Sequence, residues 1–257
     1  MPPIAESMVC ATDIATAWRE TVRMVESTPE GKMFHTVTRI SDPTAENGDL
    51  RRAANQLLQD VKLPGIETVS NTIFPEKLSA KTTDLENLSS RYLSMYPSIK
   101  KFPGNSHGTY FGRMVSYDTK RQVNQLLSIK DRIVNQLEKP GTMSSSYEMT
   151  IPDDQDDHEY TVRIQTPGTD VSLRGFPCLS SLGFQIGDGH LHLLAHYRYE
   201  YLISKGYGNY LGLARLQRYI ADQTGLKPGV LTVTAGRAYV DVSRQRVRRY
   251  LEGLPLD

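Results

Sequence analysis

The 257-residue chain has little cysteine and no long apolar run. Its two cysteines, Cys10 and Cys178, lie far apart and outside any CxxC or Cys/His zinc spacing. This argues against a disulfide framework and leaves a structural zinc ion without ligands. The apolar runs are a handful of residues long, whereas a membrane-spanning helix requires about 20.

An excess of charge of either sign is also missing. The 30 Lys and Arg residues nearly balance the 29 Asp and Glu residues, for a net charge of +1. No overall field therefore attracts nucleic acid or an anionic membrane. The start, MPPIAESMVCATDIA, lacks the basic region and apolar stretch of a signal peptide. With 39% hydrophobic and 23% charged residues, the sequence predicts a globular, cytoplasmic protein without nucleic-acid or membrane partners.

Hydrophobic periodicity predicts a mixture of helices and strands. Helical spacing occurs at 12–26, 50–60, 83–95, 119–138 and 209–225. Ser243 is expected to cap a terminal helix with a basic face, formed by Arg244, Arg246, Arg248 and Arg249. That face is interpreted as solvated, with phosphate binding as the alternative if the helix folds back.

Strand signals are strongest in the last third of the chain. Residues 177–198 predict a β-hairpin closed by Gly-Asp-Gly. Further strands are expected at 67–74, 146–151, 160–166, 230–234 and 237–242, and the Gly-, Asn- and Pro-rich stretch 100–114 is expected to be a loop. This order predicts a single α+β domain over residues 1–257.

Two groups of polar residues have spacings that a metal site would also use. The acidic run 153–159 (DDQDDHE) is interpreted as a solvated turn between strands. His190, His192 and His196 alternate on one strand face, but Arg198 shares that face and no carboxylate lies nearby. We therefore expect no bound metal.

An ordered set of motifs occupies residues 176–242. Pro177-Cys178 precedes the hairpin with its Asp188-Gly189 turn, Arg198 ends it, Asn209 opens a long helix and Tyr239 lies in the last strand. This order resembles the catalytic half of the thymidylate synthase and pyrimidine nucleotide hydroxymethylase family, in its short, archaeal-type form. The matched part is 107–242, and residues 1–100 match faintly.

The resemblance implies an α+β fold with a mixed sheet flanked by helices, and a homodimer that packs sheet to sheet. It implies methylation or hydroxymethylation at C5 of a pyrimidine nucleotide or nucleoside, with 5,10-methylenetetrahydrofolate as the one-carbon donor. In HGTYFGRM (107–114), which resembles the family's Gly-x-x-Tyr-Gly loop, Phe111 takes the place of the tyrosine.

Three residues carry the implied catalysis. Cys178 would add as a thiolate to ring C6, and Arg198 would lower its pKa by stabilising that thiolate. Glu86 would be the carboxylate that relays protons. The alternatives are a buried, unreactive Cys178 and a surface Glu86 on an amphipathic helix.

The implied substrate-binding residues begin with Asn209, whose amide would face the O4/N3 edge of a uracil-like ring. Tyr239 would bond the ribose, and Arg237 stands where the family usually has a histidine for the same sugar. The alternatives are that Asn209 only caps its helix and that Tyr239 only packs.

The sequence departs from the family pattern around the phosphate. Tyr199 and Tyr201 replace a serine and an aspartate, strand alternation turns Glu200 to the other face, and Ser144-Ser145-Ser146 replace paired arginines from the partner subunit. A 5′-phosphate would lose its strongest ligands. We therefore expect deoxyuridylate to bind weakly. Two alternatives stay open: Cys178 chemistry on a substrate without a 5′-phosphate, and a non-catalytic nucleotide-binding relative.

Overall fold

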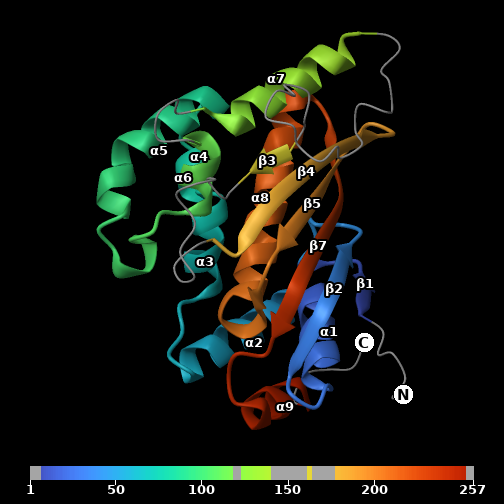
Figure 1. Cartoon of the computed structure of the whole chain (residues 1–257). Coiled ribbons are helices and arrows are strands. Elements are labelled where there is room, and N and C mark those ends of the chain that lie inside the picture. Colours follow the sequence, from blue (N-terminus) through green and yellow to red (C-terminus); the bar gives the residue numbers. More distant parts are fainter. Residues whose placement is uncertain (1–6, 118–122, 140–160, 164–176, 253–257) are drawn as a thin grey trace.

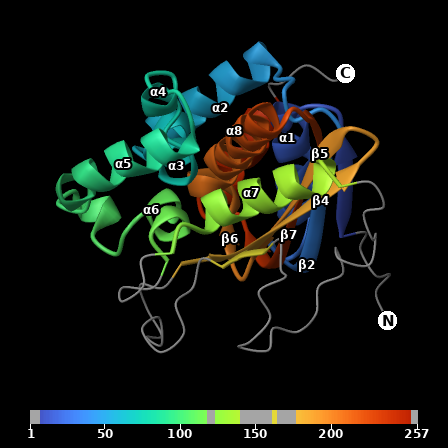
Figure 2. The same cartoon turned by 90° about the horizontal axis from the view of Figure 1, so that it is seen from above.

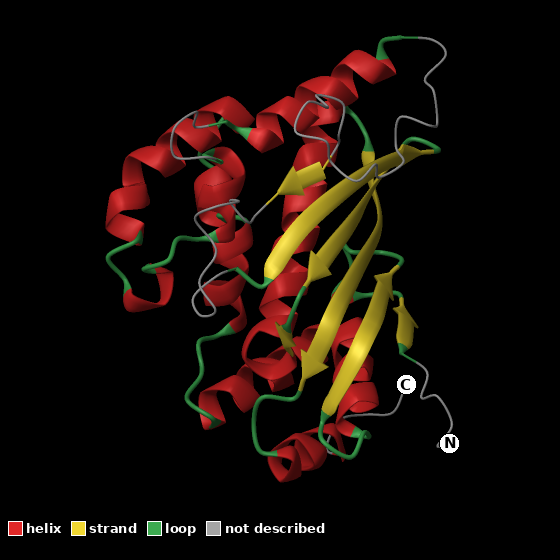
Figure 3. Cartoon of the chain, viewed as in Figure 1, coloured by secondary structure: helices red, strands yellow, loops and turns green. Residues whose placement is uncertain are grey.

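A computed structural model describes residues 7–117, 123–139, 161–163 and 177–252. Within these residues, one mixed seven-stranded sheet has the order β1-β2-β7-β5-β4-β3, with β6 paired to β7 (Figure 3). The described helices cover one face of this sheet (Figures 1 and 2). The α+β class predicted from the sequence is confirmed. No helix in the described ranges is long and apolar enough to cross a membrane.

The sheet is built from strands of very different length. They are β1 (Met8–Ala11), β2 (Lys32–Ile40), β3 (Thr161–Arg163), β4 (Leu179–Gly187), β5 (His190–Tyr197), β6 (Glu200–Tyr201) and β7 (Lys227–Tyr239). The long strand β7 lies between β2, which runs antiparallel to it, and β5 and β6, which run parallel.

The described residues contain nine α-helices. They are α1 (Ile14–Glu26), α2 (Gly48–Asp60), α3 (Ile66–Ile73), α4 (Glu76–Ser79), α5 (Leu85–Ile99), α6 (Tyr110–Val115), α7 (Gln125–Leu137), α8 (Tyr207–Thr224) and α9 (Arg244–Glu252), with a short 3₁₀ turn, η1 (Pro103–Asn105), and a π-helix, η3 (Leu202–Gly206). The group α3 to α6 lies beside α8 (Figure 1).

The predicted hairpin is confirmed as β4 and β5. Asp188 (φ 50°) and Gly189 (φ 75°) take the left-handed conformations that a tight two-residue turn requires. The antiparallel register brings the end of β5 back to the start of β4. As a result, the Arg198 N–H donates to the Cys178 carbonyl at 2.8 Å. The hairpin therefore places the two residues side by side, as the sequence predicted.

The strand predicted at 67–74 is wrong, because these residues form most of helix α3. Its buried residues Ile66, Val69, Ser70 and Ile73 follow the helical period. The helix packs very closely on α8, because a Cβ on Gly208 would lie 2.5 Å from the Cβ of Val69. This glycine therefore sets how near α3 comes to the first turn of α8.

Other element boundaries also differ from the sequence prediction. The strands predicted at 230–234 and 237–242 are one strand, since Gly236 lets the carbonyl of Arg198 approach within 3.0 Å of where a Cβ would stand. Helix α5 continues past Pro97, because Tyr96 is held by the Thr109 N–H and by the Tyr92 ring. The stretch expected as a loop at 100–114 contains η1 and most of α6. Strands β1 and β2 were not predicted, and 146–151 lies outside the described residues.

The terminal helix α9 forms as predicted, but its arginines are not all solvated. Arg244 donates to the Glu26 carboxylate at 3.1 Å and to backbone carbonyls at the end of α1, and Arg248 donates to the same carboxylate at 2.6 Å. These contacts attach α9 to α1 (Figure 1).

Candidate functional site

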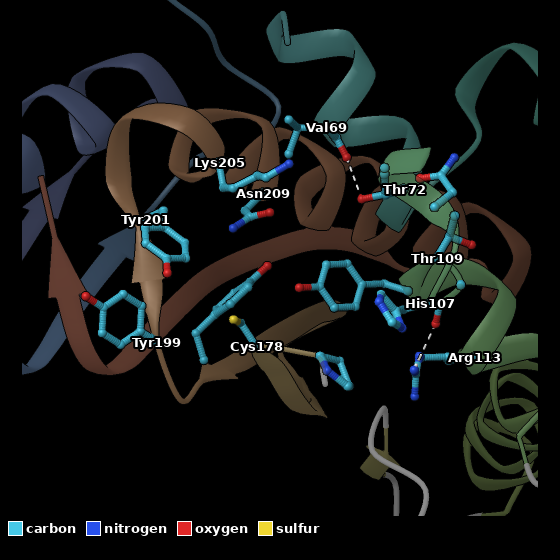
Figure 4. Close-up of a pocket in the computed structure, with 16 residues that line it drawn as sticks. Val69, Thr72, His107, Thr109, Arg113, Cys178, Tyr199, Tyr201, Lys205 and Asn209 are labelled. Atoms are coloured by element: carbon cyan, nitrogen blue, oxygen red, sulfur yellow. Dashed lines mark hydrogen bonds between the residues drawn. The ribbon is translucent and has the colours of Figure 1, made fainter. Parts of the chain in front are cut away.

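A cavity of about 250 Å³ lies where β4 begins and β5 ends. Helix α3, the segment 104–113, β6, η3 and the first turn of α8 complete its walls. Tyr199 and Tyr201 lie at one side, His107 and Arg113 at the opposite side, and Cys178 between them (Figure 4). Lys205 and Asn209 approach from α8 and the turn before it. Of the predicted site residues, Cys178, Asn209, Tyr199 and Tyr201 meet here.

Cys178 is half-buried on the cavity wall. Burial raises the pKa of its thiol above the ordinary value, and the nearby Glu200 adds to the rise. The cations Arg198 and Lys205 act in the opposite direction, but burial is the larger effect. The prediction that Arg198 depresses the pKa of Cys178 below that of a free thiol is therefore wrong, although the direction of its own contribution is right.

Arg198 is not among the described residues that line the cavity. One of its guanidinium nitrogens donates to the Pro177 carbonyl at 2.5 Å. The side chain thus holds the Pro177-Cys178 segment through this carbonyl. Among the described residues that line the cavity, Arg113 and Lys205 carry positive charges. Neither residue was assigned to the site from the sequence.

A tyrosine one position before the expected one contacts the Cys178 segment. Phe111, the counterpart of the family's tyrosine, is fully buried and packs on Phe74 and Tyr92. Tyr110 lines the cavity instead, and its hydroxyl accepts backbone hydrogen bonds from Cys178 and Leu179. Burial raises the pKa of Tyr110 to about 12, so this hydroxyl stays protonated at neutral pH.

Asn209 is the third residue of α8, so it does not cap the helix as the sequence had allowed. Its side chain is 4% exposed and lines the cavity. The amide Nδ2 donates to Oε1 of Glu200 at 3.4 Å. Among the described residues this is the single hydrogen bond of the side chain, which leaves Oδ1 available to a ligand.

Glu200 lies on the inner side of the chain between the two tyrosines, as strand alternation predicted, and is 2% exposed. Asn209 and the Tyr210 hydroxyl hydrogen-bond to its carboxyl. Burial outweighs both bonds and raises the pKa of Glu200 to about 8. The neighbouring Tyr197 hydroxyl lines the same cavity, is buried, and has no hydrogen-bond partner in the described residues.

The residues expected at the sugar form an aromatic cluster beside the cavity. The ring centroids of Tyr199 and Tyr201 are 4.9 Å apart, and each is 6.4 Å from that of Tyr239. The Arg237 guanidinium lies 5.8 Å from the Tyr199 ring and 5.2 Å from the Phe34 ring. Neither Tyr239 nor Arg237 is among the described residues that line the cavity.

Glu86 is not brought to the cavity. It lies exposed in the first turn of α5, whose buried face is formed by Leu85, Leu88 and Ser89. The serines 144–146 and the acidic run 153–159 lie outside the described residues.

The alternating histidines hydrogen-bond within the sheet. The His192 Nδ1 accepts from the Val230 N–H at 2.9 Å, and the His196 Nδ1 lies 2.9 Å from the Thr234 hydroxyl. Across the described ranges, no three His, Cys, Asp or Glu side chains gather as a metal site would require.

Comparison with known proteins adds a distant relationship. No protein-family model matches the chain. Proteins named "Putative thymidylate synthase" are similar to part of it: 32% identity over 74 residues in Methanosarcina barkeri, 28% over 89 residues in Methanococcoides burtonii and 37% over 75 residues in Methanopyrus kandleri. These matches cover 29%, 34% and 29% of this chain, and 34%, 41% and 36% of the relatives, in that order. The chain therefore spans about a third of the length of the curated relatives it matches, which supports a distant relationship to these archaeal proteins.

Proposed function

We propose that the chain is a thymidylate synthase-like enzyme that activates C5 of a pyrimidine nucleotide or nucleoside through a covalent bond to Cys178. The observation that carries this proposal is the meeting of Cys178 and Asn209 in one cavity. A thiol and a buried amide are the nucleophile and the ring-edge contact that such chemistry needs. The partial similarity to archaeal proteins with that name points the same way.

The proposed reaction begins when the Sγ thiolate of Cys178 adds to ring C6. The electron pair of the C5–C6 double bond then moves toward O4, and C5 becomes nucleophilic. The amide of Asn209 contacts the N3/O4 edge, and the Tyr110 hydroxyl braces the Cys178 backbone. C5 bonds to an electrophilic carbon or to a solvent proton. Loss of the original C5 hydrogen and expulsion of the thiolate restore the double bond.

The one-carbon donor implied by the family resemblance, methylenetetrahydrofolate, does not fit the described walls. A pterin presents two N–H donors on its aminopyrimidine edge, which a carboxylate accepts in pairs. None of the described cavity residues carries a carboxylate. No step is therefore assigned to a folate.

Exchange of the C5 hydrogen tests the proposal without any one-carbon donor. Deoxyuridine or deoxyuridylate is incubated with the protein in D₂O, and loss of the H5 proton signal is followed by NMR. We expect exchange with the wild type and none with Cys178→Ala, whereas Cys10→Ser keeps it. Wild-type protein that binds a pyrimidine but exchanges no H5 would instead favour a non-catalytic nucleotide-binding relative.

A substrate without a 5′-phosphate is the second candidate. It is favoured because the bulky Tyr199 lines the cavity, whereas Arg198 is not among the described residues that do. We expect calorimetry to give deoxyuridine an affinity at least equal to that of deoxyuridylate. A much tighter deoxyuridylate complex would show that Arg113 and Lys205 serve the phosphate and would exclude this candidate.

A further inference from the structure

A carboxyl group is buried directly behind the base-binding wall of the cavity. Burial of a carboxyl group costs free energy unless hydrogen bonds to neighbouring groups compensate for the lost water. Glu200 is 2% exposed, and its effect on the cavity passes through Asn209, whose Nδ2 lies 3.4 Å from Oε1. The family resemblance assigns no role to a glutamate at this position.

We propose that Glu200 is a positioning residue that fixes the Asn209 amide with Oδ1 toward the ligand, and so selects rings that carry N–H at N3. The inference rests on the proposed function, since it names the ring that the same cavity takes. Both the ionised and the neutral carboxyl accept a hydrogen bond through Oε1, so the orientation does not depend on which form is present.

The hydrogen-bond partners determine whether the oxygen or the nitrogen of a side-chain amide faces the cavity. Because Nδ2 is held by Glu200, Oδ1 of Asn209 faces the cavity as an acceptor. Uracil carries a donor N–H at N3, whereas cytosine carries a lone pair there. A uracil-type ring therefore completes a hydrogen bond, and a cytosine-type ring places two acceptors against each other.

A second contact holds the carboxyl itself. The Tyr210 hydroxyl bonds to Glu200 and lies 3.3 Å from the Thr38 hydroxyl, which is 2.8 Å from that of Thr21. All four side chains are buried. The carboxyl is thus tied on one side to the core and on the other to Asn209, and Tyr210 offers a matched control that leaves Asn209 untouched.

The test compares the affinities of deoxyuridine and deoxycytidine by calorimetry. We expect the wild type to prefer deoxyuridine by about tenfold or more. Glu200→Leu removes the oxygen that accepts from Nδ2, so either end of the Asn209 amide can face the ring and the ratio falls close to one, whereas Glu200→Gln keeps an accepting oxygen and keeps the ratio. Tyr210→Phe keeps the ratio, because Glu200 still holds Nδ2. A purely structural role for Glu200 would lower both affinities together and leave the ratio unchanged, and this result would overturn the inference.

Two further outcomes separate the inference from the function on which it rests. Wild-type binding of both nucleosides without preference overturns the role of Glu200 and leaves the proposed function standing. Wild-type binding of neither nucleoside and of neither 5′-monophosphate contradicts the proposed function, and the inference falls with it. If Glu200→Leu does not fold, N3-methyldeoxyuridine is titrated against the wild type. Loss of about tenfold in affinity relative to deoxyuridine supports an acceptor at N3, and equal affinity contradicts it.

Discussion

Ionisation of Glu200 makes the free energy of unfolding depend on pH. The pKa of its carboxyl is about 8 in the folded chain, against an ordinary value of 4.5, because burial disfavours the ion. Its contribution to stability is complete below 4.5 and is lost as the pH rises toward about 8. We expect urea denaturation to show this loss in the wild type and a smaller one in Glu200→Gln. A wild-type free energy of unfolding that rises steadily over this range would contradict the assignment.

Cys178 should react faster as the pH rises. Burial raises the pKa of its thiol, so the thiolate is a minor species at neutral pH. In a Cys10→Ser background, we expect iodoacetamide labelling of Cys178 and exchange of the C5 hydrogen to increase together above about pH 8.5. Arg198→Ala should move the midpoint higher, and Arg198→Lys less so, since the cation stabilises the thiolate. A wild-type midpoint below about 8.5 would contradict this expectation.

Four side chains named from the sequence line the cavity, and several other lining residues were missed. Cys178 and Asn209 belong to motifs with fixed spacing, so they could be named. Tyr110 was missed because successive residues of a helix point about 100° apart, and in the short α6 this turns Phe111 into the core and Tyr110 toward Cys178. Lys205 was missed because its direction depends on the π-helix before α8, which has no clear sequence signal.

At the scale of elements, the sequence was most reliable where a turn or a cap fixes the ends. The Asp-Gly turn fixes the β4–β5 hairpin, and Gly225 (φ 71°) ends α8. It was least reliable where packing overrides local preference. Helix α3 contains β-branched residues that favour a strand, but its contact with α8 buries Val69 and Ile73 at helical spacing.

The attachment of α9 to α1 yields a prediction for a single arginine. Arg244 donates to the buried Glu26 carboxylate and to the carbonyls of Glu26, Thr28 and Pro29. Arg244→Ala removes these four hydrogen bonds, although the Glu26 carboxylate keeps its bond from Arg248, and we expect the free energy of unfolding to fall by about 2 kcal/mol. Arg249→Ala on the same helix changes an exposed side chain and should have little effect. Equal stability of the two variants would contradict the attachment.

At the scale of the whole molecule, the sheet has one face without a described helix (Figure 2). The register places Met8 beside Val37, Val37 beside Thr234, and Thr234 beside His196. These side chains share that face with Leu194, two residues from His196. Met8 and Leu194 are 52% and 39% exposed. The same face carries Arg39, two residues from Val37, and the alternating histidines. A sheet face that combines exposed apolar side chains with hydroxyl groups can pack against another layer.

We predict that a second copy of the chain covers this face, in line with the sheet-to-sheet dimer that the family resemblance implies. In a two-fold interface each residue occurs twice, so Leu194→Glu buries two charges without a partner. We expect sedimentation velocity to show a wild-type dimer and a dissociation constant for Leu194→Glu raised by about a hundredfold or more. Leu137→Glu, at a somewhat more exposed leucine on α7 (47%), should remain dimeric. A wild-type monomer at micromolar concentration, or equal effects of the two substitutions, would show that this face is not the interface.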